Sequence, residues 1–366
     1  MHFYAIISVI EYQLRGEKVK EYSSMNHAET ITNAINSSLG VIEQDREREI
    51  ISRRFGLSGH KETLEQIGEM LSITRERVRQ LEKAILIRLR IAAGDNKIAE
   101  LGVAEKLIIR NLTETGRVAR TSDLAKKIFT GEPTASQRAQ LNFLATISSA
   151  LTAINENDRY FNAVGIAEYG DDRSIRHKVD QVVSVIKNNK TPLTIDALDV
   201  KLNYEHPSHI EAIARVSKLL STLGGLWGLS KWPTVNPRNI RDKIFVVLED
   251  KKEPMHFAEI AKAIKSSDFK RKDVTIQAIH NELIKDHRFV LIGRGIYALD
   301  NWGFEKGTVS DIIAKVLQKA TGPMDREEVV KQVLKSRKVK ETTILLNLQN
   351  KALFTRVGKS SYKIAE

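Results

Sequence analysis

The run TRERVRQLEK, residues 74–83, carries polar side chains whose types match the hydrogen-bonding groups on DNA bases. Arginine can pair with guanine through two hydrogen bonds, glutamate can accept a hydrogen bond from the amino group of cytosine, and glutamine can pair with adenine. If the run forms a helix, its exposed positions are Arg75, Glu76, Arg77, Arg79 and Gln80. These residue types predict a helix that reads base edges in the major groove of DNA.

Two preceding helices are expected to position this run. The first covers residues 45–55 and ends at Gly56, because glycine can adopt the left-handed conformation that closes many helices. The second opens with Thr63 and Gln66, which form the pattern of a capping box. After a short turn, Thr74 can cap the third helix. The order predicts a helix-turn-helix whose second helix carries the polar run.

A glycine and a set of apolar side chains indicate how these helices pack. Gly68 has no side chain and therefore allows close approach of its neighbours. The apolar residues at helical spacing are Leu64, Ile67, Leu71, Val78, Leu81, Ile85 and Leu89. An ordinary solvated helix with charge pairs three and four residues apart is the alternative interpretation of residues 74–83. The agreement of caps, turn and core spacing favours the helix-turn-helix.

The segment 45–90 as a whole resembles region 4 of bacterial sigma-70-type factors, with TRERVRQLE as its specific motif. The resemblance implies that Arg75, Glu76 and Arg79 read bases of a −35-like promoter element. The residues that it places on or near the DNA backbone are Thr74, Arg77, Gln80 and Lys83. The helix around Ile50, Ile51 and Phe55 is expected to pack within the domain and to help present a surface to the β flap of RNA polymerase. The expected partners are therefore double-stranded promoter DNA and the polymerase core.

A longer pattern recurs after this segment, at intervals of roughly 60 to 75 residues. Each copy has a helical apolar pattern, a turn with proline and an apolar residue, two further helical patterns and a short β pattern broken by glycine. The proline pairs are Pro192-Leu193, Pro254-Met255 and Pro323-Met324. Three helices closed by a hairpin predict a winged helix-turn-helix. A single irregular all-helical domain is the alternative, which the repeated order disfavours.

The expected fold class is mainly α, with tandem helix-turn-helix and winged-helix domains and short β-hairpin wings. The expected parts are an N-terminal helical or flexible segment at 1–44, the region 4-like helix-turn-helix at 45–97, and winged modules at 98–172, 173–235, 236–304 and 305–366. The module at 98–172 is a weaker copy because it lacks the proline. Met25 opens a plausible helical start, which marks residues 1–24 as a candidate overlong start.

One of the modules also resembles a known family. Residues 237–303 are similar to the HARE-type winged helix-turn-helix shared with the amino-terminal part of the RNA polymerase delta subunit, through RDKIFVVLEDKKEPMHFAEIAKAI and HRFVLIGRGIYALDNWG. The neighbouring copies look like diverged relatives of the same module. Arg294, Arg356 and Lys359 lie on the predicted hairpins and are candidate wing contacts to DNA phosphates. Simple solubility is the alternative interpretation of these charges.

The composition favours a polyanionic partner. The chain has 58 Lys and Arg against 46 Asp and Glu, a formal net charge of +12. The absence of cysteine excludes disulfides, Cys-ligated zinc, iron–sulfur clusters and thiol catalysis. No apolar run approaches the roughly 18 residues of a membrane span. The start of the chain lacks the basic leader of a signal peptide. We expect a cytoplasmic, nucleoid-associated protein with no membrane partner.

The residue types that could support catalysis or metal binding do not form a recognisable site. His206 and His209 have no third ligand nearby, and His280 and His287 lie two helical turns apart. The GKS sequence at 358–360 lacks the first glycine of a phosphate loop and the helix that should follow it. There is no nucleophile motif such as G-x-S-x-G. We therefore expect no enzyme, no cofactor, no metal site and no small-molecule substrate.

These features together favour a DNA-binding bacterial transcription initiation factor or regulator of the sigma-70 type. It would read a −35-like element through the helix-turn-helix and dock on RNA polymerase. The 44 residues before the region 4-like segment are too few for the DNA-melting region 2 of a full sigma factor, so promoter opening by this chain alone is not expected. The alternatives are a delta-subunit-like interaction scaffold on the polymerase and a conventional DNA-binding repressor.

Overall fold

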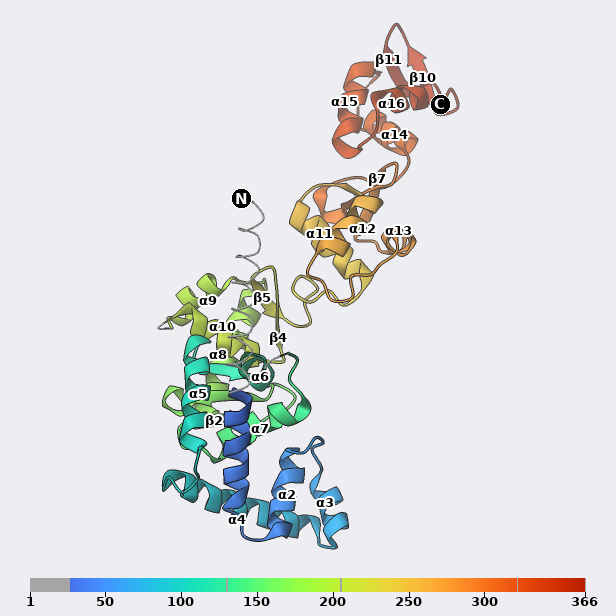
Figure 1. Ribbon diagram of the computed structural model, residues 1–366. Coiled ribbons are helices and arrows are strands. Elements are labelled where there is room, and N and C mark those ends of the chain that lie inside the picture. The colour runs from blue at the N-terminus through green and yellow to red at the C-terminus, as the bar shows by residue number, and fades with distance from the viewer. Residues whose placement is uncertain (1–26, 130, 205, 321, 366) are drawn as a thin grey trace, which may run out of the picture. The chain divides into compact units, whose positions relative to one another are not determined.

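The computed structural model describes residues 27–365 apart from 130, 205 and 321. The candidate overlong start at 1–24 and the helical start at Met25 lie outside the described residues. The chain divides into two compact units, Met1–Ser230 and Lys231–Glu366. Helices dominate each unit, and short antiparallel strands accompany them (Figure 1). The mainly α fold class with short hairpins, predicted from the periodicity, is confirmed.

The first unit opens with a helix over residues 27–40. The elements that follow are α2 (Asp45–Phe55), α3 (Leu64–Leu71), α4 (Arg75–Gly94), α5 (Leu101–Glu114), β1 (Val118–Arg120), α6 (Thr121–Ile128), α7 (Ala135–Ile147), β2 (Leu151–Ile154), β3 (Ala163–Ile166), α8 (Asp172–Asn189), α9 (Ile195–Leu202), α10 (Pro207–Val216), β4 (Leu220–Leu223) and β5 (Leu226–Leu229). Strands β1, β3 and β2 form one antiparallel sheet in that order, and β4 and β5 form a hairpin.

One hydrophobic core extends through the first unit from residue 31 to residue 166. Phe143 of α7 is fully buried, and its ring meets the ring of Phe55 of α2 edge-on, with centroids 5.1 Å apart. Ile51 of α2 and Leu89 of α4 belong to the same core. Helices α2 and α4 are therefore packed against the module that follows them along the chain.

The second unit contains two successive modules of the same order. Its elements are α11 (Ile240–Lys251), β6 (Met255–His256), α12 (Phe257–Ser266), α13 (Ile276–Lys285), β7 (Phe289–Gly293), β8 (Ile296–Leu299), α14 (Val309–Lys319), β9 (Met324–Asp325), α15 (Arg326–Ser336), α16 (Glu341–Leu348), β10 (Phe354–Val357) and β11 (Ser361–Ile364). The sheet orders are β6-β8-β7 and β10-β11-β9. Each module thus pairs three helices with a three-stranded sheet.

The apolar residue after each proline has a role that the turn pattern did not reveal. In the second unit it opens a short third strand that pairs with the hairpin, and in the first unit it makes an isolated β-bridge. The pairs are Met255 with Tyr297, Met324 with Tyr362, and Leu193 with Trp227. The connection between the first two helices of each module is thereby fixed to the sheet.

In residues 173–235 the short β pattern broken by glycine is LWGLSKW at 226–232, and the hairpin begins before it. That pattern contains only β5, and its partner β4 precedes it. The two strands are joined by Gly224 and Gly225, which have φ of 56° and 77°. Such left-handed conformations favour glycine and suit a tight hairpin turn, so the glycine pair marks the turn better than the apolar run does.

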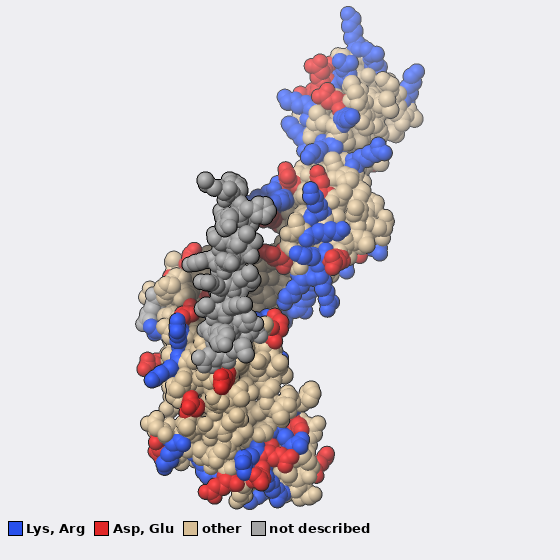
Figure 2. All heavy atoms as spheres, in the orientation of Figure 1, with Lys and Arg blue, Asp and Glu red and all other residues tan. Residues whose placement is uncertain are grey.

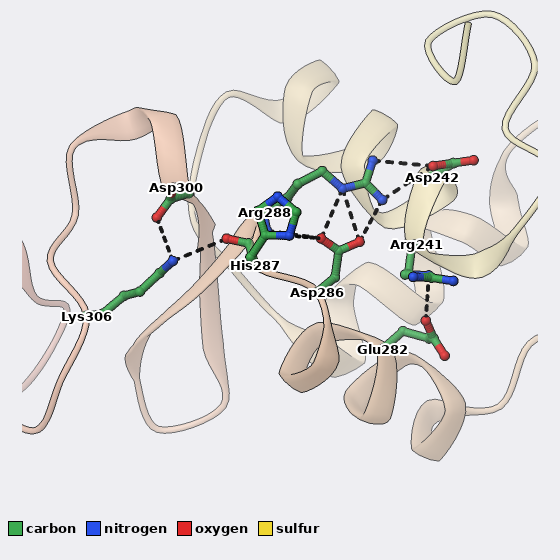
Figure 3. A network of polar contacts seen from close by, with 8 residues as sticks. All are labelled: Arg241, Asp242, Glu282, Asp286, His287, Arg288, Asp300 and Lys306. Atoms are coloured by element: carbon green, nitrogen blue, oxygen red, sulfur yellow. Dashed lines mark hydrogen bonds and ion pairs between the residues drawn. The ribbon is translucent and has the colours of Figure 1, made fainter. Parts of the chain in front are cut away.

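An ion-pair network fastens α11 to the end of α13 and the start of β7 (Figure 3). Arg288 Nη2 donates to Asp286 Oδ2 at 2.7 Å, and Arg288 Nη1 lies 3.3 Å from Asp242 Oδ1 on α11. Arg241 of α11 pairs with Glu282 of α13 at 2.9 Å. Asp286 is buried, and the hydrogen bonds from Arg288 lower the pKa of its carboxyl group.

Acid should therefore weaken the second unit partly through Asp286. A carboxyl group whose pKa is lowered by folding contributes stability above its unfolded pKa of about 3.9, and this contribution is lost as pH falls through the folded pKa. We expect Asp286→Asn to lower the free energy of unfolding at pH 7 by about 1–3 kcal/mol. The variant should also lose less additional stability than the unmodified protein when the pH falls below about 4. Urea denaturation from pH 7 to pH 2 measures both effects.

The control for this experiment is Asp268→Asn, because Asp268 is an exposed aspartate of the same unit. Its acid profile should match that of the unmodified protein. An Asp286→Asn variant with an unchanged acid profile would contradict the role assigned to the network.

Candidate nucleic-acid interface

Side-chain caps and a left-handed residue define the ends of α3 and α4. Thr63 Oγ1 accepts from the backbone N–H of Gln66, and Gln66 Oε1 accepts from the backbone N–H of Thr63, which confirms the predicted capping box. Helix α3 ends at Ser72, whose φ is 54°. Thr74 Oγ1 then accepts from the backbone N–H of Arg77 at 3.2 Å and caps α4. Ser72 and Thr74 therefore place the start of α4 at the end of a tight turn.

A small core holds α2, α3 and α4 together beneath this turn. Ile50, Ile67 and Val78 are fully buried in it, one from each helix. Gly68 lies against the turn, because a Cβ atom at this position would be 2.7 Å from the carbonyl oxygen of Ile73. The close helix approach expected at Gly68 takes the form of a contact with the backbone of the turn that leads into α4.

The three residues assigned to base reading lie together on the first turns of α4. Arg75, Glu76 and Arg79 are all exposed. Arg75 pairs with Glu65 of α3 at 2.7 Å, and Arg79 Nη2 pairs with Glu76 Oε1 at 2.6 Å. The hydrogen bonds from Arg79 lower the pKa of Glu76, and those to Glu76 raise the pKa of Arg79. At neutral pH the ordinary charge states of these groups make Glu76 an acceptor and Arg79 a donor.

The residues assigned to the DNA backbone surround this group. Arg77 and Lys83 are exposed, and neither forms an ion pair with any residue in the described part of the chain. Gln80 Nε2 donates to Glu76 Oε1 at 3.4 Å. The oxygen of Thr74 accepts the cap hydrogen bond, which leaves its hydroxyl proton available to a phosphate oxygen. The exposed start of α4 thus combines hydrogen-bond donors, the acceptor oxygens of Glu76 and Gln80, and positive charge.

The apolar side chains of α2 lie inside the protein. Ile50 and Ile51 are fully buried, and Phe55 is half-buried against Phe143. Charged pairs occupy the rest of this helix, among them Arg53 with Glu49 and Arg54 with Glu82. A surface that α2 offers to a partner is therefore charged, whereas its apolar residues anchor the helix-turn-helix.

The wing candidates lie where the sequence placed them. Arg294 is in the turn between β7 and β8, Arg356 is in β10, and Lys359 is in the turn that follows. All three side chains are exposed, although Arg356 Nη2 donates to the carbonyl oxygen of Lys359. Contact of these residues with DNA remains a prediction.

The histidines at 206 and 209 have structural contacts. His206 caps α10 by accepting from the backbone N–H of Ser208, and His209 is buried with its ring edge-on to Tyr169. Among residues 27–365, with the three gaps noted above, no group of three or more His, Asp or Glu residues is arranged to hold a metal ion. No helix in the part of the chain that the structure describes is long and apolar enough to cross a membrane.

The helix-turn-helix with its polar α4 face is typical of DNA-binding segments. Similarity to known proteins indicates which family of such segments it resembles. Residues 44–90 match the family Sigma-70, region 4. RNA polymerase sigma factor sigB of Arabidopsis thaliana is 39% identical over 61 residues, 16% of this chain and 11% of the relative. RNA polymerase sigma factor SigA1 of Synechococcus elongatus and SigA of Nostoc sp. are each 48% identical over 46 residues, 12% of this chain and 12% of each relative.

The similarity describes one segment. This chain spans only 11–12% of the length of these relatives. The match begins and ends within one residue of the segment predicted from the capping and core pattern, 45–90. The part of the protein that contains α2, α3 and most of α4 is therefore a sigma-factor-like helix-turn-helix.

Proposed function

We propose that the protein is a DNA-binding transcription factor that reads a −35-like promoter element through α4 and docks on RNA polymerase. The observation that carries the proposal is the exposed group of Arg75, Glu76 and Arg79 at the start of α4, within a segment similar to sigma-70 region 4. A helix of this kind inserts its first turns into the major groove. Flap docking would use the charged outer surface of α2 and its neighbours.

Reading bases requires these side chains to exchange partners. Arg79 would leave Glu76 and donate to guanine, and Arg75 would leave Glu65 of α3 in the same way. Glu76 would accept from cytosine, while Arg77 and Lys83 would lie against phosphates. The exposed ion pairs present little obstacle, since such pairs contribute about 0–1 kcal/mol.

Arg79→Ala tests the base-reading role. The change should weaken binding to a −35-like duplex by about 1–3 kcal/mol and binding to a scrambled duplex by much less. Arg77→Ala, assigned to the backbone, should weaken binding to both duplexes about equally. Fluorescence anisotropy with the full chain measures both affinities.

The control is Arg110→Ala, because Arg110 is an exposed arginine on α5 that pairs only with Glu114. It should leave both affinities within about twofold of the unmodified protein. Equal losses on the two duplexes for Arg79→Ala would remove the base-reading role from α4.

A second candidate function is an interaction scaffold on RNA polymerase, favoured by the delta-subunit resemblance of residues 237–303. Copurification with the polymerase core separates the candidates. The initiation factor should copurify and prefer the −35-like duplex, the scaffold should copurify without a preference, and a conventional repressor should show only the preference. If deletion of the flap tip from the polymerase β subunit abolishes copurification, the result would support docking of this protein on the flap.

A further inference from the structure

The positive charge of the chain is concentrated in the unit that does not contain α4. Residues 231–366 hold 27 Lys and Arg against 17 Asp and Glu, a balance of +10. Residues 1–230 hold 31 against 29, a balance of +2. Blue side chains crowd the visible surface of the second unit in Figure 2. The charge that attracts a polyanion is therefore supplied mainly outside the helix-turn-helix.

Much of this charge occupies the same place in the two modules of the second unit. That place is the second helix of each module together with the connection that follows it. The first basic cluster, on α12 and its connection, consists of Lys262, Lys265, Lys270, Arg271 and Lys272. The second basic cluster, on α15 and its connection, consists of Lys331, Lys335, Lys338 and Lys340. All nine side chains are exposed.

The cations of the two clusters are not held in ion pairs by the described residues of the protein, although Asp268 and Asp273 flank Lys270, Arg271 and Lys272 in the first cluster. None of the nine side chains forms an ion pair with any residue between 27 and 365 that the structure describes; Lys272 and Lys335 donate only to neutral oxygens. Other lysines of the same unit are paired: Lys315 and Lys319 both contact Glu305, at 3.1 and 3.3 Å. Unpaired cations keep their full attraction for an external anion, whereas paired ones lose part of it.

The third helices of these modules carry few of the cations that a phosphate backbone attracts. Helix α16 has the sequence ETTILLNL and no basic residue, and its Leu346 is 72% exposed. Helix α13 exposes Ile276 and Ile284, and its one basic residue is Lys285 at the end. Contact with phosphates depends on positive charge, so these helices supply little of the attraction that the second unit has for a polyanion.

The surroundings of the clusters favour a double strand. Proteins that hold single-stranded nucleic acid stack bases on accessible aromatic side chains. Among the described residues of the second unit no Phe, Tyr or Trp side chain is exposed, and His287 is the exposed aromatic ring. Exposed cations whose neighbouring Phe side chains are not exposed match a surface that contacts only the phosphates of a duplex.

We propose that the second unit binds the phosphate backbone of duplex DNA mainly through the two basic clusters, which hold nine exposed cations against the three candidate cations on the wings. The interaction is independent of sequence and supplies most of the salt-dependent affinity of the whole chain. It goes beyond the reading of a promoter element by α4, because it requires no contact with bases.

Three matched triple variants of the full chain test the proposal. Lys262, Lys265 and Lys270 are changed to Gln in the first variant, and Lys331, Lys335 and Lys340 in the second. The control changes Lys306, Lys315 and Lys319 to Gln, which removes the same charge from the same unit but at residues paired with Asp300 and Glu305. Anisotropy on a scrambled duplex is measured across a salt series, and a fourth variant changes Arg294, Arg356 and Lys359 to Gln.

Each cluster variant should weaken binding at about 0.1 M salt about tenfold or more and reduce the slope of log K against log salt by about 2–3. The control and the wing variant should change the slope by less than about 1. Equal losses of duplex affinity in the cluster variants and the control would mean that only the total charge of the unit matters, and would overturn the proposal. A larger loss of duplex affinity in the wing variant than in the cluster variants would also overturn the proposal. So would cluster variants that lose binding to single-stranded RNA but keep their affinity for the duplex.

The same measurements distinguish backbone binding by the second unit from base reading by α4. The cluster variants should retain the ratio of affinities for the −35-like and scrambled duplexes, whereas Arg79→Ala should lower that ratio. Failure of one prediction therefore leaves the other standing. The altered lysines are exposed, so thermal unfolding of every variant should match the unmodified protein.

Discussion

Replacing Phe143 with alanine should lower the free energy of unfolding of the first unit by about 3–5 kcal/mol. The ring is fully buried, and it packs edge-on against Phe55 of α2 at a centroid distance of 5.1 Å. Its removal leaves a cavity between α7 and the helix that supports α4. Urea denaturation followed by circular dichroism measures the loss, and DNA binding at moderate urea should fail earlier than in the unmodified protein.

Phe245→Ala is the control, because Phe245 is a half-buried phenylalanine of the second unit. It should leave the unfolding transition of the first unit in place. A loss below about 1 kcal/mol for Phe143→Ala would show that α2 and α7 do not share a core in solution.

Replacing Gly68 with valine should destabilise the helix-turn-helix by about 1–3 kcal/mol and weaken binding to the −35-like duplex. A Cβ atom at this position would lie 2.7 Å from the carbonyl oxygen of Ile73 and 3.4 Å from the backbone nitrogen of Arg75. The backbone cannot move without displacing the start of α4, so the base-reading residues should lose their common orientation. Thermal unfolding and anisotropy measure the two effects.

The matched control is Gly102→Val on α5. Gly102 is also helical, but no atom lies within 4 Å of the position of its Cβ. Valine is a slightly better helix former than glycine, so this change should alter stability by less than about 0.5 kcal/mol. If Gly68→Val were tolerated equally well, the close approach at the turn would not matter for the fold.

The helix-turn-helix could be predicted from the sequence because its determinants are local. Thr63, Gln66 and Thr74 cap helices through partners three residues away, and Gly56 closes α2 with a φ of 74°. Apolar spacing then identified Ile67 and Val78 of the small core, whereas Ile50 was expected from the resemblance to region 4. Leu81, predicted in the buried face, is only half-buried, because it lies where the small core meets the larger one.

The contacts between distant segments could not be predicted in this way. Phe55 and Phe143 are 88 positions apart, and nothing in the spacing of either helix pattern indicates that their rings meet. The pairing of Met255 and Met324 with their hairpins also depends on register between separated segments. The distinction between paired and unpaired lysines in the second unit likewise needs distances, since the residue types are identical.

The most direct test of base reading by α4 is selection of binding sites from a randomised pool of duplex DNA with the full chain. If α4 reads bases, the unmodified protein should enrich a short −35-like motif, and Arg79→Ala should relax the preference at one position of that motif while the flanking preferences persist. Enrichment of no motif by the unmodified protein, or of the same motif by both proteins, would contradict base reading by the start of α4.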